Sequence, residues 1–211
     1  YIIDASTSDE RKEEIIAKTE EEIEQIRESA NVLSLLLGEI AGAIKPGITT
    51  LSLDKLAYDF IHDHKGTPAF LNYQGFPFSL CISMNDQIVH GFPSDYVLKE
   101  GDIISVDGGV NLNGFISDSA YTFGVGEISA EAQQLLDVTK ESLYKGIAEA
   151  ITGKRVGDIS AAIQEHVTPY NYGIVRELVG HGVGLHLHEK PEVPNYGKRG
   201  SGPKLETGLV I

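Results

Sequence analysis

The chain has 211 residues, of which 41% are hydrophobic and 23% are charged, and its formal net charge is −14. This length and composition are typical of one globular domain with a full core, and no apolar run approaches the roughly 20 residues of a membrane-spanning helix. The negative charge disfavours general binding to nucleic acid or to anionic membranes. The single cysteine, Cys81, excludes an internal disulfide framework. The start "YIIDASTSDE" has no basic stretch before an apolar core, so we expect no secretory signal and a cytoplasmic location.

Two helices are predicted before residue 65. Thr19 followed by Glu22 has the spacing of a capping box, which closes a helix start with two side chain to backbone hydrogen bonds. The apolar residues that follow recur every three or four positions and predict one buried helical stripe: Ile23, Ile26, Ala30, Leu33, Leu37, Ile40 and Ile44. Pro46 and Gly47 end this helix, and a second periodic run at 53–61 follows a Thr and a Ser suited to capping.

Strands are predicted next, because residues 68–126 form short aromatic and β-branched runs separated by Gly, Pro, Asn and Asp. The segments "DIISVDGG" and "FISDSAYTF" are predicted to be neighbouring strands joined through the turn-prone "NLNG". Ser129 is predicted to cap another long helix, and a shorter helix is predicted near 158–167. The segment "GIVRELVG" at 173–180 is predicted to be a strand.

The order of helices, strands, helices and strands suggests an internal repeat. The segment at 45–61 aligns with the segment at 151–167 and matches Gly47 with Gly153. In addition, "EGDIISVD", which ends at Asp107, resembles the terminal "ETGLVI", which stops three residues before the equivalent of Asp107. Two related α+β halves would bury their sheets against each other and leave a cleft for function.

Two aspartates and one histidine are the candidates for a metal centre. Asp107 closes an apolar strand and Asp118 lies in the next one, and neither stretch contains Lys or Arg. Buried aspartates are costly unless they are paired or bound to a cation, although both could instead accept backbone hydrogen bonds in turns. Together with His181 on a third strand, they form a suitable set of ligands for a divalent metal, and two bridging carboxylates suit a pair of metals.

Other histidines are candidates for hydrogen bonding to a substrate. His90 in "IVHGFP" and His188 in "LHEKP" could each contact a substrate or a developing oxyanion, and each could equally be a loop histidine with no task. His186 alternates with His188, so the two would share one face of a strand. Cys81 has no adjacent histidine to activate it, and no phosphate loop or nucleophile elbow is present, so nucleophilic catalysis and nucleotide binding are not expected.

Five blocks together resemble, in order and spacing, the type I methionine aminopeptidases, which remove the initiator methionine from new proteins: "CISMNDQIVHGFP", "GDIISVDGG", "GFISDSAYTF", "VRELVGHGVG" and "HEKPEVPNYG". The resemblance implies an N-terminal extension at 1–18 and a catalytic domain at 19–211. It implies the pita-bread fold, an α+β architecture of two pseudo-symmetric halves around a metal cleft. It also implies a cytoplasmic, monomeric metalloprotease with two divalent ions (Co, Mn, Fe or Zn). Its partner would be the N-terminal methionine of nascent polypeptides, with ribosome association also expected.

The resemblance carries individual roles onto residues of this chain. Asp107, Asp118 and His181 resemble metal ligands, with Asp118 in the bridging position. His90 resembles the catalytic histidine that contacts the substrate near its amino end, and His188 resembles the one that stabilises the tetrahedral intermediate. Residues that match the wall of the methionine pocket are Tyr73, Phe76, Cys81, Phe70 and Leu187.

The chain departs from the family in two places. The family's last two ligands are glutamates, and the first lies just beyond the position of Ile211, so we expect a C-terminally truncated chain with an incomplete second half, weak metal binding and no activity by itself. Gly109 stands where many members carry a bulkier residue. Two alternatives are an Xaa-Pro dipeptidase of the same fold, which usually has a large additional N-terminal domain, and a non-catalytic pita-bread module that binds peptides or proteins.

Overall fold

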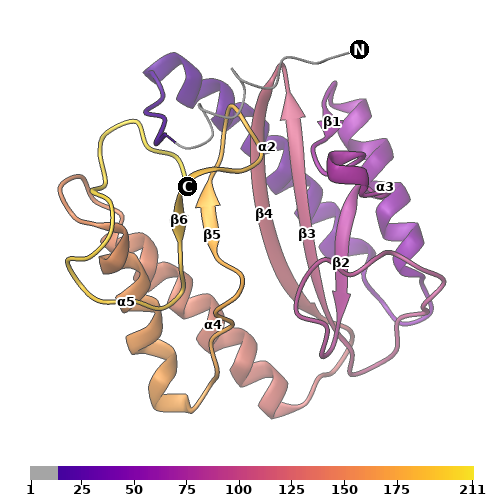
Figure 1. The fold of residues 1–211 in the computed structure, drawn as a ribbon. Helices are drawn as coiled ribbons and strands as arrows, with labels where there is room; N and C mark the ends of the chain where they lie inside the picture. The colour runs from indigo at the N-terminus through magenta and orange to yellow at the C-terminus, as the bar shows by residue number, and fades with distance from the viewer. Residues whose placement is uncertain (1–13) are drawn as a thin grey trace. The chain divides into compact units, whose positions relative to one another are not determined.

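The computed structural model describes residues 14–211, which form two compact units. The N-unit comprises Glu24–Gln134, and the C-unit comprises Leu135–Ile211 together with residues 14–23. Figure 1 shows the elements within each unit, in the predicted order of helices, strands, helices and strands. Their bounds are α2 Glu20–Ala43, α3 Thr50–Asp63, β1 Thr67–Pro68, η2 Tyr73–Gly75, β2 Leu80–Met84, β3 Ile103–Leu112, β4 Phe115–Gly124, α4 Ala130–Glu149, α5 Val156–Val167, η3 Thr168–Tyr170, β5 Gly180–Gly182 and β6 Glu189–Val193.

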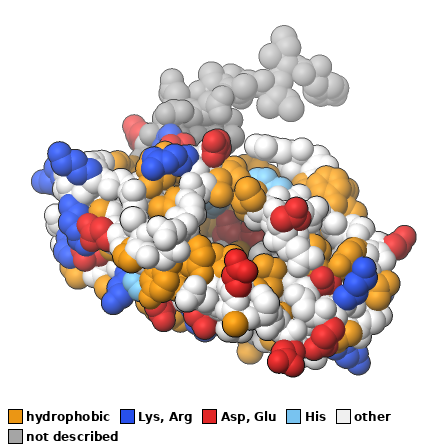
Figure 2. All heavy atoms as spheres, turned by 90° about the horizontal axis from the view of Figure 1, so that it is seen from below, with side chains coloured by type: hydrophobic (Ala, Val, Ile, Leu, Met, Phe, Trp, Pro, Cys, Tyr) orange, Lys and Arg blue, Asp and Glu red, His pale blue; other side chains and the backbone are white. Residues whose placement is uncertain are grey.

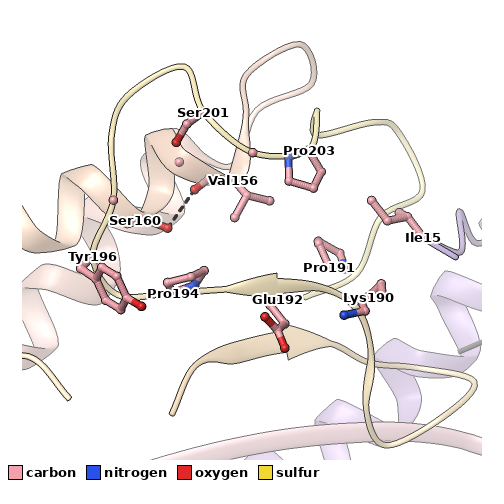
Figure 3. A pocket seen from close by; sticks show the side chains of 13 residues that line it. Ile15, Val156, Ser160, Lys190, Pro191, Glu192, Pro194, Tyr196, Ser201 and Pro203 are labelled. Atoms are coloured by element: carbon pink, nitrogen blue, oxygen red, sulfur yellow. Dashed lines mark hydrogen bonds between the residues drawn. The ribbon is translucent and has the colours of Figure 1, made fainter. Parts of the chain in front are cut away.

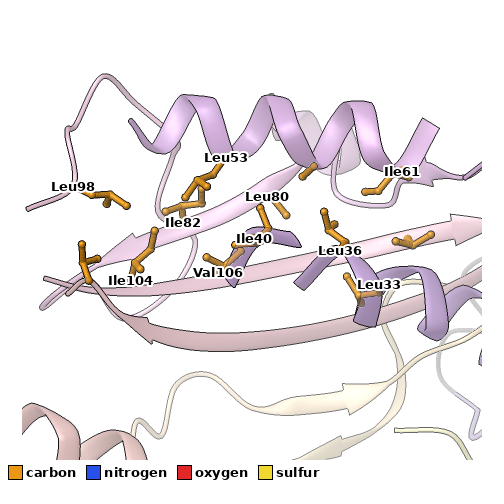
Figure 4. Close-up of a cluster of buried hydrophobic side chains, with 13 residues drawn as sticks. Leu33, Leu36, Ile40, Leu53, Ile61, Leu80, Ile82, Leu98, Ile104 and Val106 are labelled. Atoms are coloured by element: carbon orange, nitrogen blue, oxygen red, sulfur yellow. The ribbon is translucent and has the colours of Figure 1, made fainter. Parts of the chain in front are cut away.

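The N-unit is a four-stranded antiparallel sheet with α2 and α3 packed on it. Strand β3 pairs with β1 and β2 along one edge and with β4 along the other. The predicted strand pair and its connecting turn are confirmed as β3 and β4. Side chains from both helices and from the sheet meet in one hydrophobic core (Figure 4), made of Leu33, Leu36, Ile40, Leu53, Ala57, Ile61, Leu80, Ile82, Leu98, Ile104, Val106, Val110 and Val125.

Both predicted helix starts before residue 65 are confirmed by their capping contacts. Thr19 Oγ1 accepts a hydrogen bond from the Glu22 N–H (3.2 Å), and the Glu22 carboxylate accepts one from the Thr19 N–H (2.9 Å). Thr49 caps α3, because its Oγ1 accepts a hydrogen bond from the Ser52 N–H at 3.2 Å. Each of these contacts joins residues that are three positions apart, so their spacing in the sequence indicates them directly.

The buried stripe of α2 lies slightly differently from the prediction. Ala30 is exposed and Leu37 is only partly buried, whereas Ser29 and Leu36 are buried. Ser29 can be buried because its hydroxyl donates a hydrogen bond to the Val110 carbonyl at 2.8 Å. The same hydroxyl lies 2.9 Å from a serine hydroxyl on β4, so a polar contact joins α2 to the sheet one residue before the expected Ala30.

The internal repeat is visible in matching local structure. Gly47 and Gly153 both have a positive φ (96° and 92°), a conformation that favours glycine. Their N–H groups donate to equivalent carbonyls, those of Leu98 (2.9 Å) and Leu205 (3.0 Å). In each case a helix begins three residues later, α3 at Thr50 and α5 at Val156. Each unit therefore contains the same arrangement of turn, backbone bridge and helix.

The C-unit contains α5, most of α4 and the two-stranded sheet of β5 and β6. The Ser129 hydroxyl caps α4 as predicted, since it accepts a hydrogen bond from the Ala132 N–H at 3.1 Å. The predicted strand at 173–180 is wrong, because only its last residue, Gly180, belongs to β5. The preceding segment is held by side-chain contacts instead: the Arg176 guanidinium lies 4.4 Å from the Tyr196 ring centroid, and the Tyr196 hydroxyl donates to the Arg176 carbonyl (3.4 Å).

On the face drawn in Figure 2, Asp and Glu side chains are scattered among hydrophobic and uncharged ones, and several Lys and Arg side chains lie toward its left edge. Among the helices of residues 14–211, none combines the length and the apolar character needed to cross a membrane.

Candidate functional site

Asp107 and Asp118 lie on the same face of the N-unit sheet. In the pairing of β3 with β4, Asp107 is opposite Ala120 and Asp118 is opposite Gly109. Directly opposed residues share a face, as do residues two apart on one strand, so the two aspartates are diagonal neighbours. Both are half-buried. The arrangement places two carboxylates where they can bind the same cation or a pair of neighbouring cations.

Cys81 lies on this same face, because it is directly opposite Asp107 in the pairing of β2 with β3. The side chain is buried, with 6% exposure. Burial, together with the negative charges of Asp107, Asp118 and Asp54, raises the pKa of the Cys81 thiol to about 12. The thiol is therefore protonated at neutral pH. Because only the thiolate is a strong nucleophile, Cys81 contributes an apolar surface beside the carboxylates and not a nucleophile.

Phe70 and Gly109 fit together in space. A Cβ atom placed on Gly109 would lie 2.8 Å from Phe70 Cε1 and 3.0 Å from Ala69 Cβ. The Phe70 ring therefore occupies the space that a larger residue at position 109 would need. The departure noted in the sequence at Gly109 is thus accompanied by a large aromatic ring packed over β3.

Tyr73 and Phe76 lie on a tight turn that Phe92 contacts. The Phe76 N–H donates to the Tyr73 carbonyl at 2.9 Å, and Asn72 in this turn has a positive φ of 66°. The ring centroids of Phe76 and Phe92 are 5.3 Å apart in an edge-on arrangement. Because Phe92 is two residues after His90, this contact brings the histidine segment next to the turn that carries two predicted pocket residues.

His90 is held at the edge of the sheet through the residue that follows it. Its own φ is 59°, which is uncommon for a non-glycine residue. The Gly91 carbonyl accepts a hydrogen bond from the Ile82 N–H (2.9 Å), and the Gly91 N–H donates to Ser83 Oγ (3.0 Å). These contacts with β2 fix the position of the segment that carries His90. Sequence reasoning missed Ser83, whose role depends on a contact with a segment eight residues away.

Replacing Gly91 by alanine is expected to destabilise the protein by about 1–3 kcal/mol, because added atoms in a filled space force the backbone to move. The new Cβ would lie 2.1 Å from the Ile82 carbonyl oxygen, which cannot rotate away. Gly38→Ala is the matched control, since Gly38 lies within α2 with nothing within 4 Å of an added Cβ. It should stabilise the helix by about 0.5–1 kcal/mol. Urea unfolding measures both, and equal effects would contradict the prediction.

His181 and His188 lie close together in the C-unit, with ring centroids 4.4 Å apart and planes tilted by 51°. His181 Nδ1 lies 2.8 Å from the Gly182 carbonyl oxygen. A carbonyl only accepts hydrogen bonds, so Nδ1 carries the proton and the lone pair of the neutral ring is on Nε2. This is the tautomer in which histidine binds a metal while its other nitrogen is oriented by the backbone.

The two residues before His188 differ in burial. Leu187 is buried with 5% exposure, whereas His186 is exposed. The predicted site residues therefore form two groups. The N-unit holds the two aspartates, His90 and the pocket candidates Phe70, Tyr73, Phe76 and Cys81, and the C-unit holds His181, His188 and Leu187. Among residues 14–211, no three His, Cys, Asp or Glu side chains cluster closely enough to be a metal site by themselves. The donor types, two carboxylates and one imidazole, nevertheless suit a divalent transition metal.

A cavity of about 430 Å³ lies within the C-unit, apart from these residues. Figure 3 shows its wall, formed by α5, β6 and the loop that follows β6. The Ser160 hydroxyl on α5 donates a hydrogen bond to the Val156 carbonyl (3.2 Å). None of the residues that line this cavity is among the predicted site residues, so the cavity does not mark the metal centre.

Comparison with known proteins identifies the family. Residues 24–211 match metallopeptidase family M24. The methionine aminopeptidase of Clostridium acetobutylicum is 52% identical over 198 residues, which cover 93% of this chain and 79% of the relative. The methionine aminopeptidase 1 of Bacillus subtilis is 48% identical over 197 residues, which again cover 93% of this chain and 79% of the relative.

Solved structures agree with the sequence relatives. The methionine aminopeptidase of Rickettsia prowazekii has a TM-score of 0.90 at 38% identity and covers 93% of this chain and 79% of its own. The prolidase of Pyrococcus furiosus has a TM-score of 0.80 at 25% identity and covers 96% of this chain and 58% of its own. The greater identity to the aminopeptidases decides between these two branches of one fold. The chain belongs to metallopeptidase family M24 and, within that family, to the methionine aminopeptidases, with their pita-bread α+β fold.

Proposed function

We propose that the protein removes the N-terminal methionine from peptides and nascent polypeptides by metal-dependent hydrolysis of the first peptide bond. The observation that carries this proposal is the shared face of Asp107 and Asp118, in a chain 52% identical to a methionine aminopeptidase. Paired carboxylates on neighbouring strands are suited to bridging metal ions.

Asp107, Asp118 and His181 would hold the metal, and we propose two divalent ions drawn from Co, Mn, Fe and Zn. Oxygen and imidazole ligands suit all four metals. When bound, such ions lower the pKa of water and polarise the scissile carbonyl. The Nδ1 proton of His181, donated to the Gly182 carbonyl, prepares Nε2 of this residue as the ligand atom.

The other side chains bind and orient the substrate. His188 would donate a hydrogen bond to the oxyanion that develops on the carbonyl, and His90 would contact the substrate near its amino end. The methionine side chain would be enclosed by Phe70, Tyr73, Phe76, Cys81 and Leu187. Such an apolar pocket selects by shape and buried area, with about 1–3 kcal/mol for each methylene.

We propose residues 19–211 as the catalytic domain and 1–18 as an N-terminal extension. Most of that extension, 1–13, lies outside the described residues, whereas 14–18 are described and belong to the C-unit. Because nascent polypeptides are made in the cytoplasm, we propose that the protein acts there as a monomer, including on chains at the ribosome.

Methionine release from a Met-Ala-Ser peptide, with added Mn²⁺ or Co²⁺, tests the function. The assay uses the 211-residue chain and the complete polypeptide that its gene encodes. We expect release by the complete polypeptide and its loss on Asp107→Asn, which removes one negative ligand. Asp59→Asn is the matched control, because Asp59 is an exposed carboxylate that pairs with Lys55 on α3.

Other outcomes identify the alternatives. A folded, metal-loaded protein that leaves Met-Ala-Ser intact but hydrolyses Ala-Pro would be an Xaa-Pro dipeptidase. A protein that hydrolyses neither substrate and still binds peptides would be a non-catalytic module. Either result would overturn the proposed aminopeptidase function.

A further inference from the structure

Glu189 is a buried carboxylate directly after His188, and both of its oxygens are engaged. Its side chain is 1% exposed. Oε1 accepts hydrogen bonds from the Leu185 N–H (2.7 Å) and the His186 N–H (2.8 Å). Oε2 pairs with the ammonium group of Lys18, whose side chain is 0% exposed. One carboxylate therefore joins the loop between the two site histidines to a residue 171 positions away.

The segment 14–18 is fixed against the C-unit by its backbone as well. The Lys18 N–H donates to the Gly208 carbonyl at 2.7 Å, and Ile15 forms a β-bridge with Lys190. A Cβ atom on Gly208 would lie 2.5 Å from the Lys18 carbonyl oxygen, so the two backbones are in close contact. Figure 3 shows Ile15 beside Pro191, at the rim of the C-unit cavity. Lys18 is thus presented to Glu189 by a segment that is itself anchored.

The loop between the histidines starts at Gly182, which pairs with Glu189 at the end of the β5–β6 ladder. It contains Gly184, with a φ of 138°, and glycine is the least conformationally restricted residue. Further backbone contacts of the loop are the hydrogen bond from the Gly184 N–H to the His186 carbonyl (3.1 Å) and a longer one from the Val183 N–H to the Val210 carbonyl (3.3 Å). The two bonds to Glu189 are the shortest of this set, and burial prevents water from replacing them.

We propose that Lys18 and Glu189 are positioning residues for His181 and His188, so that segment 14–18 is part of the machinery of the site; the catalytic consequence rests on the proposed function. Glu189 holds the loop by its backbone, and Lys18 holds Glu189 in the orientation that reaches the loop. A buried charge whose partner is removed must rearrange, protonate or draw in water. Removal of the Lys18 charge therefore displaces the carboxylate and, with it, the loop that carries both rings.

The experiment compares Lys18→Met with Lys154→Met. Lys154 is the matched control, because it also forms an ion pair with a glutamate of the C-unit, Glu149, but at the surface. Imidazole ¹⁵N spectra of the metal-free complete polypeptide report the tautomer and environment of each histidine. We expect Lys18→Met to shift the His181 and His188 signals while those of His62 and His64, on α3, stay in place. Lys154→Met should shift none of them.

Kinetics on Met-Ala-Ser give the second readout. We expect Lys18→Met to lower kcat by about 10-fold to 100-fold, the range typical of residues that orient metal ligands, with a smaller change in KM. Lys18→Arg keeps the charge and should recover part of kcat and part of the wild-type histidine spectrum. It also keeps the proposal testable if Lys18→Met does not fold.

Two results overturn the proposal. One is a folded Lys18→Met protein with wild-type histidine signals and wild-type kcat, since a merely structural ion pair would change only the free energy of unfolding. The other is a Lys18→Arg protein that folds and matches Lys18→Met in every readout. If the wild-type protein releases no methionine, the aminopeptidase function fails, whereas the histidine spectra still decide whether Lys18 positions the two rings.

Discussion

Replacing His188 by alanine is expected to lower kcat for methionine release on the order of 100-fold to 1000-fold, the usual cost of losing one hydrogen-bond donor to an oxyanion. In the proposed site the ring would lie beside the metal, because its centroid is 4.4 Å from that of His181, the proposed metal ligand. A donor beside the metal can reach the carbonyl oxygen as charge develops on it. Steady-state kinetics with Met-Ala-Ser, at saturating metal, measure the effect.

The matched control for this variant is His186→Ala. His186 is exposed, and its contact with Glu189 is made by its backbone N–H, which alanine retains. We expect kcat to change by less than about two-fold, in keeping with surface substitutions that remove no partner. Metal content should remain that of the wild type in both variants, because Asp107, Asp118 and His181 are unchanged. Equal kcat values for the two variants would contradict the role of His188.

Replacing Leu36 by alanine is expected to lower the free energy of unfolding by about 2–5 kcal/mol, as is usual when a leucine is truncated in a close-packed core. Leu36 is 0% exposed and lies between α2 and the sheet in the N-unit core (Figure 4). Truncation removes apolar contacts and leaves a cavity that the surrounding strands can only partly fill. Urea unfolding at neutral pH, with the m-value checked for constancy, measures the loss.

Leu35→Ala is the adjacent control, since Leu35 is 59% exposed on the same helix. We expect its effect to lie within about 0.5 kcal/mol, because the residue makes few contacts and alanine favours the helix. The two variants differ by one position and so test the rotation of α2 about its axis. A larger loss for Leu35→Ala would show that the stripe of buried residues faces the other way.

The burial pattern of α2 shows what sequence periodicity can and cannot predict in this protein. Apolar spacing and the capping box correctly indicate where α2 begins and that one face is buried. Periodicity did not distinguish Leu36 from Leu37, or Ser29 from Ala30, because adjacent residues differ by only one step around the helix. That choice depends on the sheet, whose Val110 carbonyl accepts the hydrogen bond that makes a buried Ser29 acceptable.

Strands depend more on their partners than helices do. The pair β3 and β4 was predicted because long β-branched runs flank a turn, and their register follows from that turn. The segment at 173–179 has similar residues but joins no ladder, since Arg176 contacts Tyr196 instead. Local composition cannot indicate which segments pair with another strand in a sheet.

The sequence by itself determined the main helices and the central strand pair, and the resemblance in its five ordered blocks identified the aminopeptidase family, because these features depend on neighbouring residues or on matched motifs. Tertiary structure alone decided which side chains support the candidate ligands. In the sequence, Lys18 is one of several charged residues before α2, and Glu189 is the residue after His188, so neither position alone indicates a role. Only folding buries both and pairs them across 171 positions, since burial and pairing arise from contacts between distant segments.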